Sequence, residues 1–537
     1  MKRKQEKVAL LSVYYKEGIA EFAQQLIVLG WRILASAGTF RHLDAAKVPV
    51  ENVSSLVGGD PILGHKVVTL SRELHAGLLA SAELESELDE LESLGLPFIG
   101  LVCVDLYPLE EEIAKLGATP DSVRAQTDIG GPTMLSAGAK GQRIVVCRPE
   151  DREPVIKWLD GGQPERENFI AALAARADFT VARYRLLSAQ YHGNGQFEGI
   201  VGEKVIACRY GENAYQTPAV MYGCRTDDPL ALQKFEVVLG DPGFNNWVDV
   251  DRLLATITRI AATFHKNHDD VPYIAVGGKH GNPCGAAYGS TTEEVIRMMV
   301  EGEPQDLFGG LVITNFEIGE REAELLHAHM AGSVRRVLDG VIAPAFTEGA
   351  IEHLRRKGDR CSFIRNPELE FIDANSLDQA PRFRYVRGGF LTQPNYSFVL
   401  DIRSDDCTKY GKAIFEQEVD MLLAHAINQT SNSNTITLVK DGKLIGNGVG
   451  QQSRVGGAKL AIMRANSAGH DIAGAVAASD SFFPFVDGVE TLIDAGVAAI
   501  VSTSGSIRDK EVIAFCESKA KPIYLIPDKI GRGFFGH

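Results

Sequence analysis

The residue pair best suited to proton transfer is Lys279-His280, which opens the stretch KHGNPCG at residues 279–285. The apolar run at residues 273–276 precedes it and predicts a strand, so both side chains would lie on a tight loop at a sheet edge. Histidine suits proton transfer near neutral pH, and a neighbouring ammonium tends to keep it neutral. Since an adjacent Lys-His is more often a solvated turn, the pair alone indicates a candidate base and no particular reaction.

A zinc deaminase is the alternative that this segment suggests, because Pro283-Cys284 resembles the start of a P-C-x-x-C signature. Ala287 stands where the second cysteine would be required, and no H-x-E segment precedes the pair at a suitable distance. The sequence HKNH at residues 265–268 is more typical of a solvated helix face than of a metal site. We therefore expect no metal requirement.

A glycine-rich run, IGNGVGQQSR at residues 445–454, follows a predicted strand at residues 435–439. Its spacing does not fit a dinucleotide fingerprint, because Gln451 stands where the third glycine is expected. Arg454 at its end could bind a phosphate or a carboxylate through two parallel hydrogen bonds. A hairpin turn with an exposed arginine is the alternative.

Three loops near the N-terminus combine small residues and hydroxyls: SVYYKEG (residues 12–18), SAGT (36–39) and TDIGGPTM (127–134). Each is predicted to follow a strand and to precede a helix, where backbone N–H groups and the helix dipole favour an anion. Each could also be an ordinary helix cap. Three such loops in one small domain favour a site for an anionic ligand.

The elements that would position these residues follow an alternating pattern. Apolar runs at residues 8–13, 31–36, 97–106 and 143–147 predict strands separated by helices, which indicates a parallel sheet covered on both faces. Further predicted strands lie at residues 273–276, 435–439, 498–502 and 522–526, with helices between them. In such sheets ligands bind beyond the carboxyl ends of the strands.

The chain has 537 residues, which indicates about two to four domains. The glycine-rich stretch at residues 190–203 predicts a boundary, so we expect one domain at residues 1–195 and a larger region of two subdomains at residues 196–537. The net charge of −15 disfavours binding to nucleic acid or to anionic membranes. Eight cysteines without a CxxC pair and no long apolar run indicate a cytoplasmic protein with reduced thiols.

Five segments occur in one order between residues 8 and 159: SVYYKEG, SAGTFRHL, LHAGLLA, VDLYPLEEEI and TDIGGPTMLSAGAK. This series resembles the methylglyoxal-synthase-like domain of the bifunctional purine-biosynthesis family, which combines AICAR (phosphoribosylaminoimidazolecarboxamide) formyltransferase with IMP cyclohydrolase. The resemblance implies a doubly wound parallel sheet and ring-closure chemistry at Tyr107, Asp128 and Lys140. It also implies a set of nucleotide-binding residues: Ser12, Tyr14, Lys16, Ser36, Gly38, Thr39, Lys66 and Thr69.

One departure from the family concerns the cyclisation site. The family segment is approximately G-G-R-V-K-T-L-H-P, whereas this chain has GHKVVTLSR at residues 64–72, with Val68 at the position of the catalytic lysine. A valine can neither protonate a carbonyl nor bind phosphate. Positioning could supply much of the rate of an intramolecular ring closure, with Lys66, Lys140 or Arg72 compensating. The alternative is a formyltransferase whose N-terminal domain is an impaired nucleotide-binding or regulatory module.

Seven further segments cover most of residues 209–537: RYGENAYQTPA, KHGNPCGAA, LFGGLV, LDGVIAPAF, SNTITLVKDGKLIGNGVGQQSRV, ASDSFFPFVDGV and SGSIRDK. They resemble the formyltransferase part of the same family and imply a cytidine-deaminase-like α/β fold. The resemblance implies proton transfer by Lys279 and His280 with Asn434 nearby. The implied nucleotide contacts also include Arg209, Tyr210, Gly309, Asp339, Arg454 and Phe482, and the implied folate contacts are Val455, Asp487, Ser506 and Ile507.

This part also departs from the family in three places. Ala214-Tyr215 replaces Pro-His, QTSNSN at residues 429–434 lacks the family's lysines, and Arg532 lies one residue early. The resemblance implies small-molecule partners (AICAR, formyl-AICAR, IMP and 10-formyltetrahydrofolate as co-substrate), no metal, and a homodimer. Whether folate or free formate donates the formyl group stays open at this point.

Overall fold

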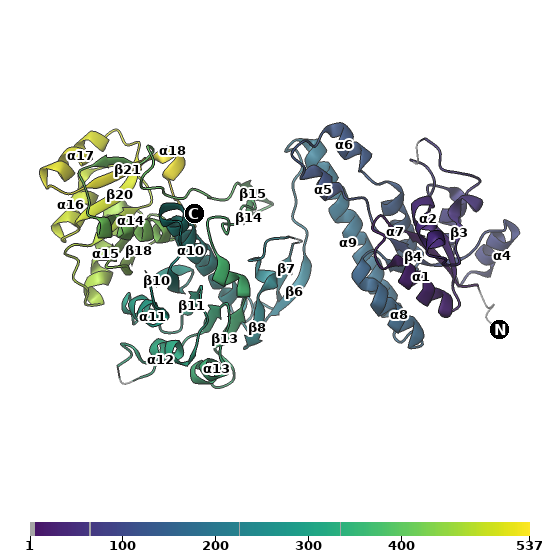
Figure 1. Cartoon of the computed structure of the whole chain (residues 1–537), viewed down its shortest axis with the longest axis horizontal. Coiled ribbons are helices and arrows are strands. Elements are labelled where there is room, and N and C mark those ends of the chain that lie inside the picture. The colour runs from purple at the N-terminus through teal and green to yellow at the C-terminus, as the bar shows by residue number, and fades with distance from the viewer. Residues whose placement is uncertain (1–5, 64–65, 225, 333, 537) are drawn as a thin grey trace. The chain divides into compact units, whose positions relative to one another are not determined.

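The structure is a computed structural model that describes residues 6–63, 66–224, 226–332 and 334–536. The chain divides into two compact units, Met1–Val201 and Gly202–His537 (Figure 1). The expected boundary at residue 195 falls just after α9 (Arg166–Gly193), and the first unit also includes the short segment that follows this helix.

The first unit contains a five-stranded parallel sheet in the order β3-β2-β1-β4-β5. Its strands are β1 (Val8–Ser12), β2 (Arg32–Ala35), β3 (Glu51–Asn52), β4 (Ile99–Val104) and β5 (Ile144–Val146). The strands β1, β4 and β5 are almost fully buried, as continuous apolar runs require when helices cover both faces. The expected doubly wound parallel sheet is confirmed.

Helices cover both faces of this sheet. One core contains side chains of α1 (Ile19–Val28), α2 (Ala37–Ala45) and α8 (Arg152–Asp160), and the other contains those of α3 (Arg72–Leu79) and α7 (Gly130–Lys140). The long helix α9 contributes to both cores. The remaining helices are α4 (Glu85–Ser93), α5 (Leu109–Ile113) and α6 (Pro120–Ala125), with 3₁₀ turns at Val53–Ser55 and Pro149–Asp151.

The second unit is built on one twelve-stranded mixed sheet in which the same six-strand pattern occurs twice. Each half has an antiparallel hairpin, three parallel strands and an antiparallel edge strand, and the halves meet where β10 pairs with β18. The first half comprises β9 (Tyr273–Lys279), β10 (Asn282–Gly289), β11 (Leu311–Thr314), β12 (Gly340–Ala343), β13 (Ser362–Arg365) and β8 (Glu236–Leu239). The second comprises β17 (Ile436–Lys440), β18 (Lys443–Gly448), β19 (Val476–Ser479), β20 (Ala499–Ser504), β21 (Ile523–Pro527) and β16 (Thr408–Tyr410).

A long helix precedes each hairpin: α10 (Phe244–His268) in the first half and α14 (Phe415–Asn428) in the second. Both helices share one core on one face of the sheet, whereas each half has its own core on the other face. The second unit therefore consists of two half-sheets joined edge to edge, with one core in common. The other helices are α11 (Thr292–Glu301), α12 (Glu320–Ala328), α13 (Glu348–Leu354), α15 (Arg454–Ser467), α16 (Val486–Asp494), α17 (Asp509–Ser518) and α18 (Asp528–Gly531).

Two small hairpins complete this unit, β6 (Glu203–Cys208) with β7 (Ala219–Gly223) and β14 (Arg382–Val386) with β15 (Gly389–Gln393). The 3₁₀ turns lie at Leu232–Lys234 and Pro367–Phe371. Among the residues described, no helix is long and apolar enough to cross a membrane.

Candidate active sites

The turn between β9 and β10 presents the Lys-His pair. Lys279 Nζ donates to the carbonyl of Phe308 at 2.9 Å, and His280 has a φ of 53°, in the left-handed region. Lys279 is half-buried and His280 is exposed. The turn is shorter than the sequence predicts, because β10 already begins at Asn282 and buries Cys284. The pair therefore lies at the tip of a tight hairpin whose strands are held in the middle of the sheet.

A second loop, between α14 and β17, lies directly beside this hairpin. The backbone N–H of Asn432 donates to Asn282 Oδ1 at 3.0 Å, and Arg252 of α10 donates to Asn432 Oδ1 at 2.7 Å. Asn434 donates from Nδ2 to the carbonyl of Gln451 at 2.9 Å and exchanges two backbone hydrogen bonds with the same residue. These contacts place His280 and Asn434 on adjacent loops, one from each half-sheet.

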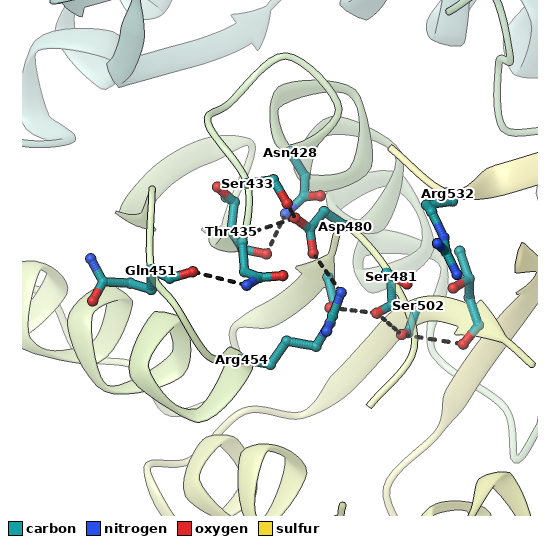
Figure 2. A network of polar contacts seen from close by, with 12 residues as sticks. Asn428, Ser433, Thr435, Gln451, Arg454, Asp480, Ser481, Ser502 and Arg532 are labelled. Carbon is teal, nitrogen blue, oxygen red and sulfur yellow. Dashed lines mark hydrogen bonds and ion pairs between the residues drawn. The ribbon is translucent and has the colours of Figure 1, made fainter. Parts of the chain in front are cut away.

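Figure 2 shows the polar network that continues from this loop. Arg454 begins α15, and its Nη2 lies 3.5 Å from Oδ1 of the fully buried Asp480. Asp480 also accepts from the backbone N–H of Thr435 at 3.1 Å, which fixes its carboxylate. Burial lowers the pKa of Arg454, and its buried Nε makes no hydrogen bond among the described residues. This guanidinium therefore keeps an N–H without a partner among the described residues.

A second guanidinium shares an aromatic neighbour with the first. The Cζ atoms of Arg454 and Arg532 lie 5.8 and 5.7 Å from the ring centre of Phe482. Arg532 forms an ion pair with Asp528, and Ser481 and Thr503 donate to the same carboxylate at 2.9 and 2.7 Å. Two cations beside an aromatic ring suit a planar ligand that carries negative charge.

Gly309 and Asp339 lie at the same edge of the sheet as the Lys-His turn. A Cβ at Gly309 would lie 4.0 Å from Lys279 Nζ, so this glycine is next to the ammonium. The backbone N–H of Asp339 donates to the carbonyl of Gly310 at 2.9 Å, and its side chain pairs with Arg356. Both residues precede strands that run antiparallel to β9, which is why they meet its end.

Arg209 and Tyr210 lie at the start of α10, where the carbonyl of Tyr210 accepts from the backbone N–H of Phe244 at 3.1 Å. Arg209 is exposed, and its Cζ lies 6.0 Å from the Tyr210 ring. No contact among the described residues joins either side chain to Arg454 or Asn434. These two residues are therefore placed beside α10, which carries Arg252, and not within the network of Figure 2.

The expected folate residues lie on the exposed rim of the second half-sheet. Val455 is in the first turn of α15, and its backbone N lies 3.9 Å from the Cβ position of Gly488 at the start of α16, beside Asp487. Ser506 follows β20 and donates its backbone N–H to Asp509 at 3.1 Å. Ile507 is fully exposed. The rim thus offers an apolar side chain and a carboxylate close to the arginine pair.

In the first unit, the loops after β1 and β2 meet as expected. Ser12 Oγ donates to Ser36 Oγ at 2.9 Å, and Thr39 Oγ1 accepts from the backbone N–H of Val13 at 3.0 Å. Ser36 is the N-cap of α2 but makes no capping bond of its own, and the first turn, which includes Gly38, contains no acidic residue. The start of α2 is therefore suited to an anion.

Lys16 supplies a cation beside these loops. Its Nζ donates to the carbonyl of Tyr14 at 2.9 Å, and burial lowers its pKa. The backbone N–H of Tyr14 donates to Asp105, and the rings of Tyr14 and Tyr107 lie 5.6 Å apart. Burial raises the pKa of Asp105, although the N–H groups of the loop oppose this effect.

Asp128 lies close to Tyr107, because its carboxylate accepts from the backbone N–H of that residue. Asp128 Oδ1 accepts from the backbone N–H of Gly131 at 2.9 Å, and burial raises the pKa of this carboxyl. Burial and the nearby Asp128 raise the pKa of the Tyr107 hydroxyl, which keeps it protonated. Thr69 packs against Gly130, where a Cβ would come within 2.5 Å of its hydroxyl. This arrangement pairs a possible proton acceptor with a proton donor.

Lys140 lies apart from this group within one chain, so its expected role at the ring-closure site stays a prediction. Asp128 precedes α7 and Lys140 ends it, so about 16 Å of helix separates them. Lys140 lies just before β5, at the amino edge of the parallel sheet, whereas the loops of Ser12 and Ser36 lie at the carboxyl edge. The connectivity of a parallel sheet makes these edges opposite.

The segment that departs from the family lies beside α3. Lys66 is exposed, Val68 is half-buried and packs with Leu106 against the core, and Thr69 is buried. Gly64 and His65 lie outside the described residues. Val68 therefore adds an apolar side chain to the core that Leu106 also contacts. The half-buried Lys16 donates to the carbonyl of Tyr14, whose ring lies 5.6 Å from that of Tyr107.

The network also contains residues that the sequence did not single out, notably Asp249, Asn282, Asn432 and Asp480. Asp480 and Asn432 lie within or beside segments whose family resemblance is clear, which is a usable signal. Asn282 lies within the quoted segment KHGNPCG, whereas Asp249 has no such signal, because its partners are distant along the chain. Among the residues that the structure describes, no group of His, Cys, Asp and Glu side chains is arranged to hold a metal ion.

Together the two sites define a two-domain α/β enzyme that acts on phosphorylated small molecules. The chain belongs to the AICARFT/IMPCHase bienzyme family, whose model matches residues 139–464. A second model, described as an MGS-like domain, matches residues 18–133. Family membership assigns this chain AICAR formyltransferase and IMP cyclohydrolase activities, which belong to purine biosynthesis.

Curated relatives share almost the whole length. The bifunctional purine biosynthesis protein PurH of Anoxybacillus flavithermus is 37% identical over 520 residues, covering 94% of this chain and 95% of the relative. The PurH protein of Aquifex aeolicus is 34% identical over 519 residues, covering 95% and 96%. A solved chain, the crystal structure of ForH, is 34% identical and covers 36% of this chain and 100% of its own, with a TM-score of 0.32.

Proposed function

We propose that the second unit transfers the formyl group of 10-formyltetrahydrofolate to the 5-amino group of AICAR, with His280 as the base. This amine is a weak nucleophile because its lone pair is conjugated with the ring. Its nitrogen bonds to the formyl carbon, the bond from that carbon to N10 of the folate breaks, and His280 takes the amine proton. A proton returned to N10 completes tetrahydrofolate and formyl-AICAR.

The contacts around His280 support this assignment. Lys279 Nζ lies at the same hairpin and could stabilise negative charge on the formyl oxygen as the amine attacks. Asn434 is on the adjacent loop, and the guanidinium groups of Arg454 and Arg532 flank Phe482, on which the imidazole ring of AICAR would stack. The observation that carries the proposal is this meeting of the Lys-His hairpin with a cationic, aromatic loop cluster at one sheet edge.

The folate would bind along the rim formed by Val455, Asp487, Ser506 and Ile507. The flat pterin needs an apolar surface, and the exposed Ile507 and Phe485 provide one within the same loop cluster. A carboxylate such as Asp487 could accept hydrogen bonds from the amino group of the pterin ring. Free formate would need neither feature, so the rim favours a folate donor.

The first unit would close the purine ring. The carboxamide nitrogen of formyl-AICAR bonds to the formyl carbon and loses one proton. The formamide nitrogen then loses its own proton as it forms a double bond to that carbon, and the formyl oxygen, having gained two protons, departs as water to give IMP. Asp128 would accept a proton, and the Tyr107 hydroxyl, whose pKa is raised by burial, would donate to the departing oxygen. Lys16, Ser12, Ser36 and Thr39 would hold the phosphate at the start of α2.

Val68 raises a second candidate function, in which this unit binds the nucleotide without closing the ring, because a valine cannot donate a proton. Ring closure here is intramolecular, so positioning supplies much of its rate and Tyr107 can take over proton donation. We therefore infer that the valine is compatible with cyclisation.

We also infer a homodimer and a cytoplasmic location, as the family resemblance implies. The hairpin of β14 and β15 presents exposed apolar side chains, with Tyr385 81% and Leu391 61% exposed. Such side chains are typical of a surface that a second copy covers.

The test of the transferase assignment is His280→Ala. Loss of the base should lower kcat for formyl-AICAR formation by about 100-fold or more, while AICAR still binds. Formyl transfer is followed by the absorbance of tetrahydrofolate and AICAR binding by calorimetry. Ring closure from added formyl-AICAR in the same chain serves as the control and should be unchanged. Full transferase activity in this variant would contradict the assignment.

A further inference from the structure

The two half-sheets of the second unit allow a comparison within one molecule. The hairpin of β9 and β10 turns at Lys279-His280-Gly281, and the hairpin of β17 and β18 turns at Lys440-Asp441-Gly442. His280 and Asp441 have φ values of 53° and 51°, and the following glycines have 71° and 75°. The backbone of the catalytic turn is therefore a repeated feature of the fold.

The lysines of the two turns are held alike but differ in charge environment. Lys279 Nζ donates to the carbonyl of Phe308 at 2.9 Å, and Lys440 Nζ donates to the carbonyl of Asp471 at 3.0 Å. Each acceptor lies in the loop that precedes the next strand of its half. Lys440 also pairs with the Asp471 carboxylate at 3.3 Å, whereas no ion pair joins Lys279 to a carboxylate in the part of the chain that the structure describes.

Each turn is also held by an aspartate from the preceding long helix, at the sixth residue of α10 and of α14. Asp420 accepts from the backbone N–H groups of Asp441 at 2.9 Å and Gly442 at 2.8 Å. Asp249 occupies the equivalent position and faces the N–H groups of His280 and Gly281, which lower its pKa against the larger effect of burial. The two carboxylates thus share the task of holding a left-handed turn.

The difference between the two turns is the side chain beside the carboxylate. Asp420 faces a turn that carries Asp441. Asp249 instead lies close enough to the imidazole of His280 that a positive charge on this ring lowers the pKa of the Asp249 carboxyl. Among the described residues, the charged groups around this turn are Asp249 and Arg252 from α10 and Lys279 from the hairpin itself. A negative charge there would offset the two cations.

We propose that Asp249 is a positioning residue for formyl transfer, which fixes the His280 turn through the backbone and stabilises the imidazole once it has taken the amine proton. This inference rests on the proposed role of His280 as the base. A carboxylate beside an imidazole favours the protonated form and orients the ring, as in other histidine bases supported by an aspartate. Both Asp249 and Asp420 hold the turn of their half-sheet, but only Asp249 lies beside an imidazole on which it can act.

The repeat supplies a matched control for the test. Asp249→Asn and Asp420→Asn each remove one negative charge from a helix and leave an oxygen that can accept from the turn. Both should lower the unfolding midpoint by a similar amount. Asp249→Asn should lower kcat for formyl transfer by about 10- to 100-fold with little change in the KM for AICAR, whereas Asp420→Asn should stay within about twofold of the parent chain.

The pH dependence separates positioning from simple loss of structure. The acidic limb of the kcat profile should move to lower pH in Asp249→Asn, because the amide no longer favours the protonated imidazole. Asp249→Glu keeps the charge and should keep the limb in place, even if the longer side chain lowers the rate. In a His280→Ala background, Asp249→Asn should cause no further loss of kcat.

The outcomes distinguish this inference from the proposed function. Equal kcat and equal pH profiles for Asp249→Asn and Asp420→Asn would overturn it, as would a further loss in the His280→Ala background. Unchanged activity in His280→Ala alone would instead refute the base. If Asp249→Asn fails to fold, the acidic limb of the kcat profile in Asp249→Glu provides the test. Displacement of this limb by more than about one pH unit would contradict the proposal that the negative charge of residue 249 stabilises the protonated imidazole.

Discussion

At the scale of single residues, Asp128 shows how burial prepares a side chain for its reaction. Burial raises the pKa of this carboxyl, which makes it a stronger base than an exposed aspartate once it is ionised. We expect Asp128→Asn to lower the rate of IMP formation from formyl-AICAR by about 100-fold or more. The rate of the parent chain should fall as the pH drops towards the raised pKa, because the protonated carboxyl cannot accept a proton.

IMP absorbance measures this reaction, and Asp121→Asn is the matched control because Asp121 is exposed in α6 and pairs with Arg124. That variant should keep its activity. An Asp128→Asn chain that closes the ring at the parent rate would show that positioning alone is sufficient.

At the scale of elements, Glu303 ties the two half-sheets together. It follows α11, is 5% exposed, and accepts from Arg464 of α15 at 2.8 Å. Burial and a hydrogen bond with Asp306 raise its pKa to about 8, despite the opposing Arg464. The pKa of Glu303 is higher in the folded than in the unfolded chain. The stability that the Glu303 side chain contributes is therefore fully present below its unfolded pKa and is lost as the pH rises towards 8.

We expect the free energy of unfolding to fall by about 2 kcal/mol between pH 5 and pH 9 and Glu303→Gln to remove most of this dependence. Urea unfolding at several pH values measures it. Glu301→Gln is the control: burial alone would raise the pKa of Glu301, but Lys443 and His329 together lower it. Its removal should therefore lower stability at neutral pH and leave the dependence between pH 5 and pH 9 in place, because a carboxyl with a lowered pKa loses its stabilising effect only as the pH falls through that pKa. An unchanged pH dependence in Glu303→Gln would contradict the assignment.

At the scale of the whole molecule, the residues proposed for each candidate site come from one compact unit, either Met1–Val201 or Gly202–His537. We expect residues 1–201 and 202–537, produced separately, to keep ring closure and formyl transfer respectively. Mixing the two with AICAR and 10-formyltetrahydrofolate should then produce IMP, measured by chromatography. Loss of ring closure in the separate first unit, with its fold intact by circular dichroism, would show that its site needs the second.

The sequence predicted the elements that carry local signals. Continuous apolar strands indicated the parallel sheet of the first unit, and the Ser, Thr and Gly loops indicated where Ser12, Ser36 and Thr39 would meet. It did not predict that Lys140 lies at the opposite edge of the sheet from Asp128. The motif gives only the order of residues along the chain, and the helix α7 separates the two residues in space. The roles inferred from family resemblance for the site residues stay predictions until the variants are measured.

The chain by itself determined the two α/β units, the family and the identity of the Lys-His pair, because apolar periodicity and ordered motifs are properties of neighbouring residues. The tertiary structure alone decided which distant residues meet: Asn282 with Asn432, Arg454 with Asp480, and Asp249 with the His280 turn. It also revealed the repeated half-sheets, whose sequences differ while their strand order is the same. Hydrogen bonds across a sheet edge depend on strand order and register, and short stretches of sequence do not specify either.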